Sequence, residues 1–142
     1  LVDDDPSFTM LVRSAMEMAV SPDTPYVLTA LDDGQHAVDY ITGVGEYADR
    51  GHHPLPHLML IDQRMNQMDG ADVLKELAAN ETARSIPKCI MSTSDSAKQR
   101  QTAYSLGATF CITKPLELEQ LAEKMRLLVE FGTRVLEPQR SA

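Results

Sequence analysis

The stretch from Leu58 to Asp62 (Leu-Met-Leu-Ile-Asp) constrains the fold of this chain more than any other part of it. Four apolar residues run directly into an acid, and Asp69-Gly70 follows as a turn signal. A short apolar run between polar segments predicts a strand that is buried on both faces, as in a parallel sheet. Asp62 then lies where the strand leaves the sheet, which is the edge where open α/β sheets place their chemistry.

Further apolar runs alternate with helical patterns along the chain, and this alternation predicts an α/β fold with a parallel sheet covered on both faces. The natural topology is a flavodoxin-like (βα)5 doubly wound sheet with strand order 2-1-3-4-5. A Gly/Pro-rich stretch, residues 43–56, predicts a long surface loop. The other strands are expected at residues 1–2, 26–30, 88–91 and 109–112, and the last helix from about Glu117 to Phe131.

Length, charge and apolar content exclude several classes of protein. The chain has 142 residues, which fits one domain, and its net charge of −8 argues against nucleic acid as a partner. No apolar run approaches the ~20 residues that span a bilayer, so no membrane segment is expected. Cys89 and Cys111 both lie in strand-like segments, which indicates buried free thiols and a cytoplasmic location.

The carboxyl ends of four strands bring together Asp3 and Asp4, Asp62, Ser92 and Lys114. Three carboxylates in one crevice repel each other, so ionising all of them costs free energy. A hard cation such as Mg²⁺ removes that cost. An amine and a hydroxyl opposite them can hold phosphoryl oxygens. The set is therefore suited to phosphoryl transfer with a carboxylate as the nucleophile.

At these residues the chain resembles the response-regulator receiver domains of two-component signalling, and the similarity spans nearly the whole chain. Each motif alone is weak, but their order on alternating strands and helices is specific. The matching motifs are Val2–Pro6, Leu60–Asp62 with Met68–Gly70, Ile86–Pro87 ahead of Ser92, and Leu106–Ala108 with Lys114–Pro115. The pattern is most similar to stand-alone receivers of the phytochrome-associated type.

The resemblance implies that Asp62 accepts a phosphoryl group from a sensor histidine kinase or a histidine phosphotransfer protein. Mg²⁺ (or Mn²⁺) would be bound by Asp3, Asp4, Asp62 and the backbone carbonyl of Arg64. Ser92 and Lys114 would bind phosphoryl oxygens, and the Lys114–Pro115 bond could be cis. The only catalysis implied is self-phosphorylation and self-dephosphorylation. We expect one receiver domain over residues 1–142, with a first strand that lacks a few residues and no output domain.

The sequence departs from the family pattern near the site. Asn66 stands where proline is usual, and Arg64 where small or polar residues are common. Cys111 stands where the family has an aromatic switch residue, with Phe110 beside it. Ser92, Phe110 and Cys111 are therefore the candidate switch residues. Arg64, Asn66 and Ser94 are the candidate modulating residues.

Two other functions remain open. A phosphohydrolase with an aspartate nucleophile typically has a second acid two residues later, where Arg64 stands. A receiver-like scaffold that no longer accepts phosphate is the third possibility. A metal site at His52, His53 and His57 is disfavoured, because a mobile loop seldom preorganises one.

Apolar residues of the last helix suggest a face for self-association or partner docking. Its apolar stripe is expected to cover the sheet, which leaves Leu127 and Phe131 off the stripe. With an exposed Tyr104, these residues could form a small apolar patch. The resemblance implies a homodimer or docking face made of the fourth and fifth helices and the strand between them.

Overall fold

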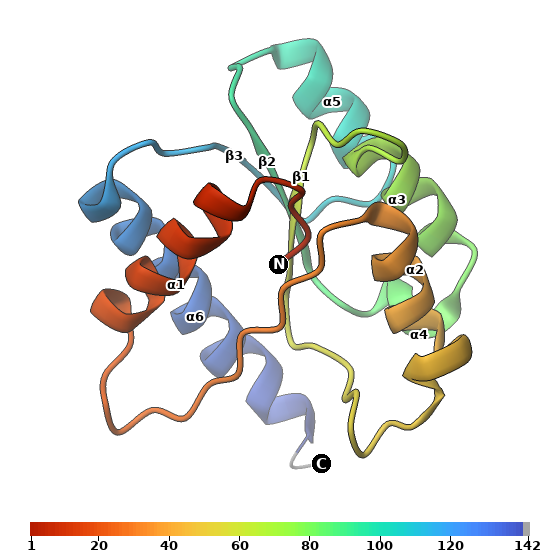
Figure 1. The fold of residues 1–142 in the computed structure, drawn as a ribbon, viewed down its shortest axis with the longest axis horizontal. Helices are drawn as coiled ribbons and strands as arrows, with labels where there is room; N and C mark the ends of the chain where they lie inside the picture. The colour runs from red at the N-terminus through yellow and green to blue at the C-terminus, as the bar shows by residue number, and fades with distance from the viewer. Residues whose placement is uncertain (141–142) are drawn as a thin grey trace.

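The computed structural model describes the backbone of residues 1–140 and the side chains of residues 1–133. A parallel sheet lies between two layers of helices (Figure 1). No helix within the described part of the chain is long and apolar enough to cross a membrane. The elements are α1 (Pro6–Ala19), α2 (Gly34–Thr42), the 3-10 helix η1 (Gly45–Ala48), β1 (Met59–Asp62), α3 (Gly70–Ala78), α4 (Glu81–Arg84), β2 (Lys88–Ser92), α5 (Ala97–Ser105), β3 (Phe110–Thr113) and α6 (Leu118–Arg140).

The sheet has the predicted strand order, although its first two members are reduced to single bridges. Strands β1, β2 and β3 pair in parallel in that order. Val2 forms parallel bridges to Ile61 on one side and to Leu31 on the other. The spatial order is therefore Leu31, Val2, β1, β2, β3, which is 2-1-3-4-5. The predicted doubly wound α/β fold is confirmed.

The strand predicted at residues 26–30 is wrong: the parallel bridge on this edge is at Leu31, and the terminal amine of Leu1 adds one hydrogen bond to the Thr29 carbonyl at 2.9 Å. Leu31 donates its N–H to the carbonyl of Leu1 at 2.8 Å, and Asp3 donates to the carbonyl of Leu31 at 3.0 Å. The neighbouring segment offers backbone partners only over Leu1–Asp3, and α1 begins at Pro6. Val27 is 91% exposed, whereas Leu28 is partly buried against the apolar cluster that contains residues of α1 and α6.

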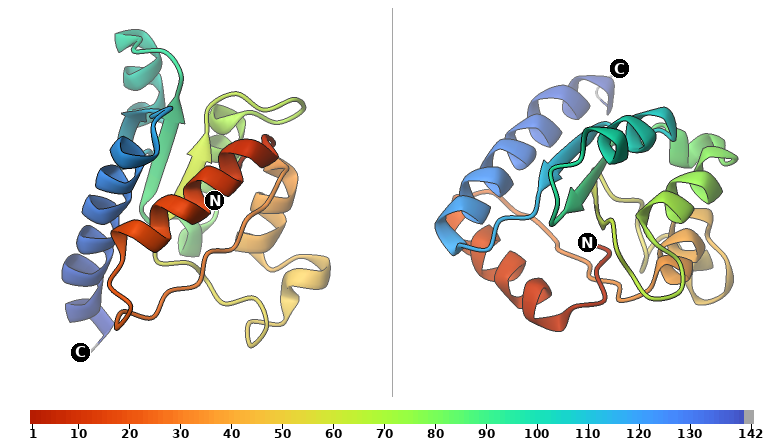
Figure 2. Two further views of the ribbon diagram at one scale, coloured as in Figure 1. Left: turned by 60° about the vertical axis from the view of Figure 1, so that its left-hand side comes forward. Right: turned by 90° about the horizontal axis from the view of Figure 1, so that it is seen from above.

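Side chains of the strands alternate between two apolar clusters, one on each face of the sheet. Met59 and Ile61 point to α2 and α3, whereas Leu60 points to α1 and α6. Figure 2 shows α1 and α6 together on one side of the sheet, and α2, α3 and α4 on the other. The predicted stripe of α6 is confirmed, but the helix runs to Arg140 and not only to Phe131. The buried residues of that stripe are Leu121, Ala122, Met125 and Leu128.

A short helix, α4, was not predicted from the sequence, because four residues give no helical period. Asn80 caps its start by accepting a hydrogen bond from the N–H of Ala83 at 2.9 Å. The buried ammonium of Lys88 closes its other end by donating to the carbonyls of Ala83 (2.5 Å) and Ile86 (2.8 Å). Desolvation lowers the pKa of Lys88. A cation at a helix C-terminus is the favourable placement for this charge.

Residues 43–56 form a surface loop, as predicted, but the loop is held in place. It contains η1, and the Arg50 guanidinium reaches back to α2, donating to the carbonyls of Tyr40 (2.7 Å) and Ile41 (2.8 Å). Gly43 ends α2 with φ of +74°, and a Cβ there would lie 2.9 Å from the Arg50 guanidinium. The arginine therefore satisfies the last carbonyls of α2, which would otherwise lack partners.

We expect Arg50→Ala to lower the free energy of unfolding by about 2 kcal/mol, because it leaves helix carbonyls without charged donors. Chemical denaturation measures this change. Arg84→Ala is the matched control, since Arg84 is exposed on α4, and it should stay within about 0.5 kcal/mol of wild type. Equal stability of the two variants would show that the loop is not held by Arg50.

Candidate functional site

The acids that follow the first strand are held by backbone N–H groups. Asp3 is 2% exposed, and its Oδ1 accepts a hydrogen bond from the N–H of Asp5 at 2.8 Å. Asp5 itself caps α1 by accepting from the N–H of Ser7 at 2.9 Å. Asp4 is partly exposed and accepts from the N–H of Asn66 at 3.2 Å. The acids at the start of the chain therefore have separate tasks: Asp5 begins a helix, while Asp3 and Asp4 face the site.

Asp62 ends β1, and the chain turns tightly after it. Gln63 continues the pairing by donating its N–H to the carbonyl of Met91 at 2.8 Å, and it accepts from the N–H of Gly70 at 3.0 Å. A Cβ at Gly70 would lie 2.8 Å from the Asp62 carbonyl, so only glycine allows α3 to begin so close to the strand end. Asp69, which the sequence placed in this turn, caps α3 in a reciprocal capping box with Asp72.

Lys114 joins the carboxylates of two distant segments. Its Nζ lies 2.8 Å from Asp3 Oδ2 and 3.7 Å from Asp62 Oδ2, and its side chain is 8% exposed. The same nitrogen lies 3.9 Å from the centre of the Phe8 ring. Its backbone N–H donates to the Ser92 carbonyl, and the Lys114–Pro115 peptide bond is trans, not cis. The amine is therefore fixed by an ion pair and an aromatic face.

The sequence placed Phe8 in the core but missed its position beneath the site amine. The available signal was that Phe8 is the first core residue of the helix that directly follows the acids. The short link between the acids and α1 brings that ring close to Asp3.

Burial and the neighbouring Asp3 carboxylate raise the pKa of Asp62 above its ordinary value of 3.8. The Lys114 ammonium and a hydrogen bond from the Arg64 backbone act in the opposite direction. The folded protein therefore binds the Asp62 proton more tightly than the unfolded chain does. By linkage, ionising Asp62 costs folding free energy as the pH rises above 3.8, and the cost is absent below that value.

The carboxylates of Asp3, Asp4 and Asp62 form a group that fits a divalent cation. Each offers an oxygen, and these ligand atoms all lie within 4.8 Å of one another. Carboxylate oxygens are the ligands that Mg²⁺ and Mn²⁺ prefer. A cation held by these three residues would neutralise the repulsion that raises the pKa of Asp62.

The histidines of the loop do not join a metal-binding group in the part of the chain that the structure describes. His52 pairs with Asp49 at 2.7 Å, and His53 packs edge-on against the rings of Tyr40 and Tyr47. Their roles in the structure are local packing and pairing.

Ser92 ends β2, between the strand that carries Asp62 and the strand that leads to Lys114. Its Oγ accepts a hydrogen bond from the N–H of Ser94 at 3.2 Å and lies 3.5 Å from Ser94 Oγ. Ser96 caps α5 by accepting from the N–H of Gln99 at 3.3 Å. The structure therefore separates the hydroxyl at the strand end from the one that begins the helix.

Arg64 and Asn66 are both exposed in the loop between Asp62 and α3. Arg64 contributes a backbone hydrogen bond to Asp62, and Asn66 contributes its N–H to Asp4. Their backbones are therefore part of the site, and their side chains are exposed.

Phe110 and Cys111 point to opposite faces of the sheet. Phe110 belongs to the cluster of α1 and α6, where its ring packs edge-on against Phe131 at 4.9 Å. Phe131 is therefore partly covered, and the expectation that it stands exposed beside Leu127 is wrong. Cys111 faces α5, and its thiol lies 4.0 Å from the Arg100 carbonyl. Burial raises the pKa of this thiol.

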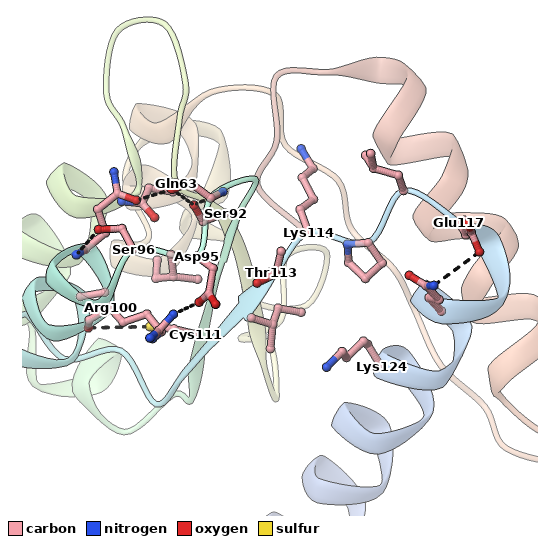
Figure 3. A pocket seen from close by; sticks show the side chains of 18 of the residues that line it. Gln63, Ser92, Asp95, Ser96, Arg100, Cys111, Thr113, Lys114, Glu117 and Lys124 are labelled. Carbon is pink, nitrogen blue, oxygen red and sulfur yellow. Dashed lines mark hydrogen bonds and ion pairs between the residues drawn. The ribbon is translucent and has the colours of Figure 1, made fainter.

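A groove of about 960 Å³ runs from the site along β3, between α5 and α6. Figure 3 shows the Arg100 side chain beside Asp95, with which it forms an ion pair. It also shows the contact between the Cys111 thiol and the backbone carbonyl of Arg100. Ser92 and Lys114 stand at the site end of this groove, and Lys124 lies on α6. The site therefore opens onto the face that contains α5, β3 and α6.

Comparison with known proteins identifies the class that this fold and site define. Residues 1–126 match the family model of the response regulator receiver domain, so the chain belongs to that family. Such domains act in two-component signalling, are phosphorylated on an aspartate and bind a divalent metal. They interact with histidine kinases or phosphotransfer proteins. The predicted family and function are confirmed.

The relatives of this chain include phytochrome-associated response regulators. The phosphorylated cyanobacterial phytochrome response regulator RcpA is 28% identical, with a TM-score of 0.82 over 94% of this chain and 91% of that one. RPA3017, a response regulator in red light signalling of R. palustris, is 32% identical, with a TM-score of 0.82 over 92% of this chain and 90% of that one. Rcp1 of Synechocystis sp. in its Mn²⁺-bound form is 26% identical, with a TM-score of 0.76 over 92% and 89%.

We expect Asp62→Asn to raise the metal-free unfolding free energy at pH 7 by roughly 1 kcal/mol, because it removes one of the repelling carboxylates. The gain should shrink as the pH falls through the raised pKa of folded Asp62, and it should vanish below pH 3.8, where Asp62 becomes protonated in both states. Added Mg²⁺ should stabilise wild type more than the variant. Thermal denaturation across pH measures both effects.

Glu76→Gln is the control, since Glu76 is an exposed acid of α3 outside the cluster. It should reproduce neither the pH-dependent gain nor the loss of the Mg²⁺ response. An Asp62→Asn variant that is less stable than wild type at pH 7 would contradict this account.

Proposed function

We propose that this receiver accepts a phosphoryl group on Asp62 and that Asp3, Asp4, Ser92 and Lys114 complete the site. The observation that carries the proposal is the ammonium of Lys114 between the carboxylates of Asp3 and Asp62. A fixed cation beside a strand-end carboxylate can neutralise a phosphoryl group as it arrives. Lys114 and Ser92 lie at the ends of neighbouring strands, so both are positioned to bind its oxygens.

In the proposed reaction, an Asp62 carboxylate oxygen attacks the phosphorus of a phosphohistidine. A P–O bond forms, the P–N bond breaks, and the histidine nitrogen leaves with the electron pair and takes a proton from water. Lys114 neutralises one phosphoryl oxygen and Ser92 donates its hydroxyl proton to another in a hydrogen bond. Positioning and charge neutralisation supply most of the catalysis in such transfers. Hydrolysis of the acyl phosphate by water restores Asp62.

The cation of this site is proposed to be Mg²⁺, bound by the carboxylates of Asp3, Asp4 and Asp62 and by the backbone carbonyl of Arg64. Mg²⁺ prefers few carboxylates and several waters, which fits a cluster at a partly open sheet edge. When bound, it supplies positive charge to the phosphoryl oxygens.

Two exposed apolar side chains, on segments that directly follow site residues, support docking of a kinase or phosphotransfer partner there. Met10 on α1 is 70% exposed, and Leu116, shortly after Lys114, is 82% exposed. Exposed apolar residues on these segments suit a partner that must bring its phosphohistidine to the sheet edge. The thiols of Cys89 and Cys111 are unpaired, and we propose the reducing cytoplasm as the location.

A homodimer through α5, β3 and α6 stays a prediction, and its apolar patch is smaller than the sequence indicated. Tyr104 is 50% exposed and Leu127 is 51% exposed, as expected. Phe131 packs on Phe110 and adds less surface. Single exposed apolar residues of this kind are common on monomers, so association has to be measured.

We expect acetyl phosphate with Mg²⁺ to add one phosphoryl group to wild type and none to Asp62→Asn. Intact mass spectrometry measures the adduct, and Asp69→Asn is the control because Asp69 caps α3. A lasting adduct supports a receiver, rapid turnover of acetyl phosphate a phosphohydrolase, and no reaction a scaffold. Undiminished labelling of Asp62→Asn would contradict the assignment.

We further expect Arg64→Ala to change the rate of self-dephosphorylation by several-fold. Arg64 follows the acceptor by two residues, where a long cation can bind the phosphoryl group or hinder the attacking water. Phosphate release from the labelled protein measures the rate, and Asn66→Ala tests the other exposed residue of the loop. An unchanged rate would show that the Arg64 side chain points away from the site.

A further inference from the structure

The hydroxyl of Ser92 is connected to helix α5 by a chain of hydrogen bonds. Ser94 Oγ donates to Gln99 Oε1 at 2.7 Å, and Gln99 lies in the first half of α5. Ser94 is also in contact with Ser92, through its backbone N–H (3.2 Å) and through its Oγ (3.5 Å). The Gln99 side chain of α5 is therefore connected to Ser92, at the strand end of the site, through Ser94.

The direction of these hydrogen bonds follows from proton counting. A serine hydroxyl has one proton, and that of Ser94 is committed to the Gln99 carbonyl oxygen. Ser94 Oγ must therefore accept in its contact with Ser92, which makes Ser92 the donor. The proton of Ser92 is thus directed toward Ser94. A phosphoryl oxygen on Asp62 needs the same proton, so the two hydrogen bonds exclude each other.

Helix α5 is attached in a way that lets it respond to such a change. Ala103 is its only buried residue in the structure as described, so little apolar packing holds it. Grooves of about 960 Å³ and 360 Å³ adjoin it, and Gln99 lines both. Its remaining contacts include the Arg100 ion pair with Asp95 and the Cys111 thiol near the Arg100 carbonyl (Figure 3). Elements with few buried apolar contacts rearrange at low cost.

We propose that Gln99 is a positioning residue which, through Ser94, holds the Ser92 hydroxyl away from Asp62 and couples its release to α5. When the Ser92 hydroxyl turns to the phosphoryl group, Ser94 Oγ loses the hydrogen bond that it accepts from Ser92. The Ser94–Gln99 hydrogen bond then restrains α5 less. The relay needs neither Phe110 nor Cys111. It rests on the proposed function, because it requires a phosphoryl group on Asp62.

The test uses beryllofluoride with Mg²⁺ as a phosphoryl mimic on the full chain. Gln99→Leu removes the acceptor for Ser94, so Ser94 can give its own proton to Ser92 and the Ser92 proton is released. We expect this variant to bind beryllofluoride about three- to tenfold more tightly, the range for one neutral hydrogen bond. Gln99→Glu keeps an acceptor and should not bind more tightly than wild type. Gln101→Leu, an exposed neighbour on α5, is the matched control.

Two further measurements separate the relay from a merely structural effect. In a Ser92→Ala background, Gln99→Leu should no longer change the affinity, since the proton it releases is gone. Amide hydrogen exchange in α5 should rise when wild type binds beryllofluoride and should already be raised in free Gln99→Leu. Ser94→Ala removes the same Ser94–Gln99 hydrogen bond from outside the helix, so it should reproduce both the tighter binding and the raised exchange in α5.

The outcomes are distinguishable. Equal affinity of wild type, Gln99→Leu and Ser94→Ala overturns the relay and leaves the proposed function intact. The same gain in the Ser92→Ala background also overturns the relay. A wild-type protein that binds no beryllofluoride overturns the relay together with the proposed function.

Discussion

The ion pair of Lys114 with Asp3 and Asp62 is the interaction on which the rest of the site depends. It joins residues that are 111 positions apart in the sequence, and its groups are nearly excluded from water. Charged groups in such a place are stable only when they are paired and hydrogen-bonded. Three separate strand ends must therefore meet, and the order of the parallel sheet is what brings them together.

The Lys114 ammonium only partly neutralises the negative charge of the site carboxylates, and this leaves the site able to bind further positive charge. Burial and the neighbouring Asp3 carboxylate keep the pKa of Asp62 raised in spite of Lys114. A cation or a partner's phosphoryl group changes this balance, since each alters the charge at the sheet edge. The site is thus built to respond to charged ligands, as the receiver family requires.

Helix α5 is anchored differently from helices α1 and α6. The α1 and α6 side has a continuous apolar cluster that includes Phe8, Met125 and Phe110. Helix α5 on the other side is polar and rests mainly on hydrogen bonds and one ion pair. Because apolar packing resists displacement more than exposed polar contacts do, a change at Ser92 is passed more easily to α5.

The sequence by itself determined the parallel α/β fold, the strand order and the position of Asp62, because apolar periodicity and turn residues are local signals. It placed the strand at residues 26–30 and the exposure of Phe131 wrongly. Pairing at Leu31 depends on partners in Leu1–Asp3, and Phe131 depends on the facing Phe110 ring. The cation–ring contact of Lys114 with Phe8 and the Ser92–Ser94–Gln99 chain were decided only by the tertiary structure. Their physical reason is the same: each depends on the distance and direction between side chains from different elements, and sequence spacing does not specify these.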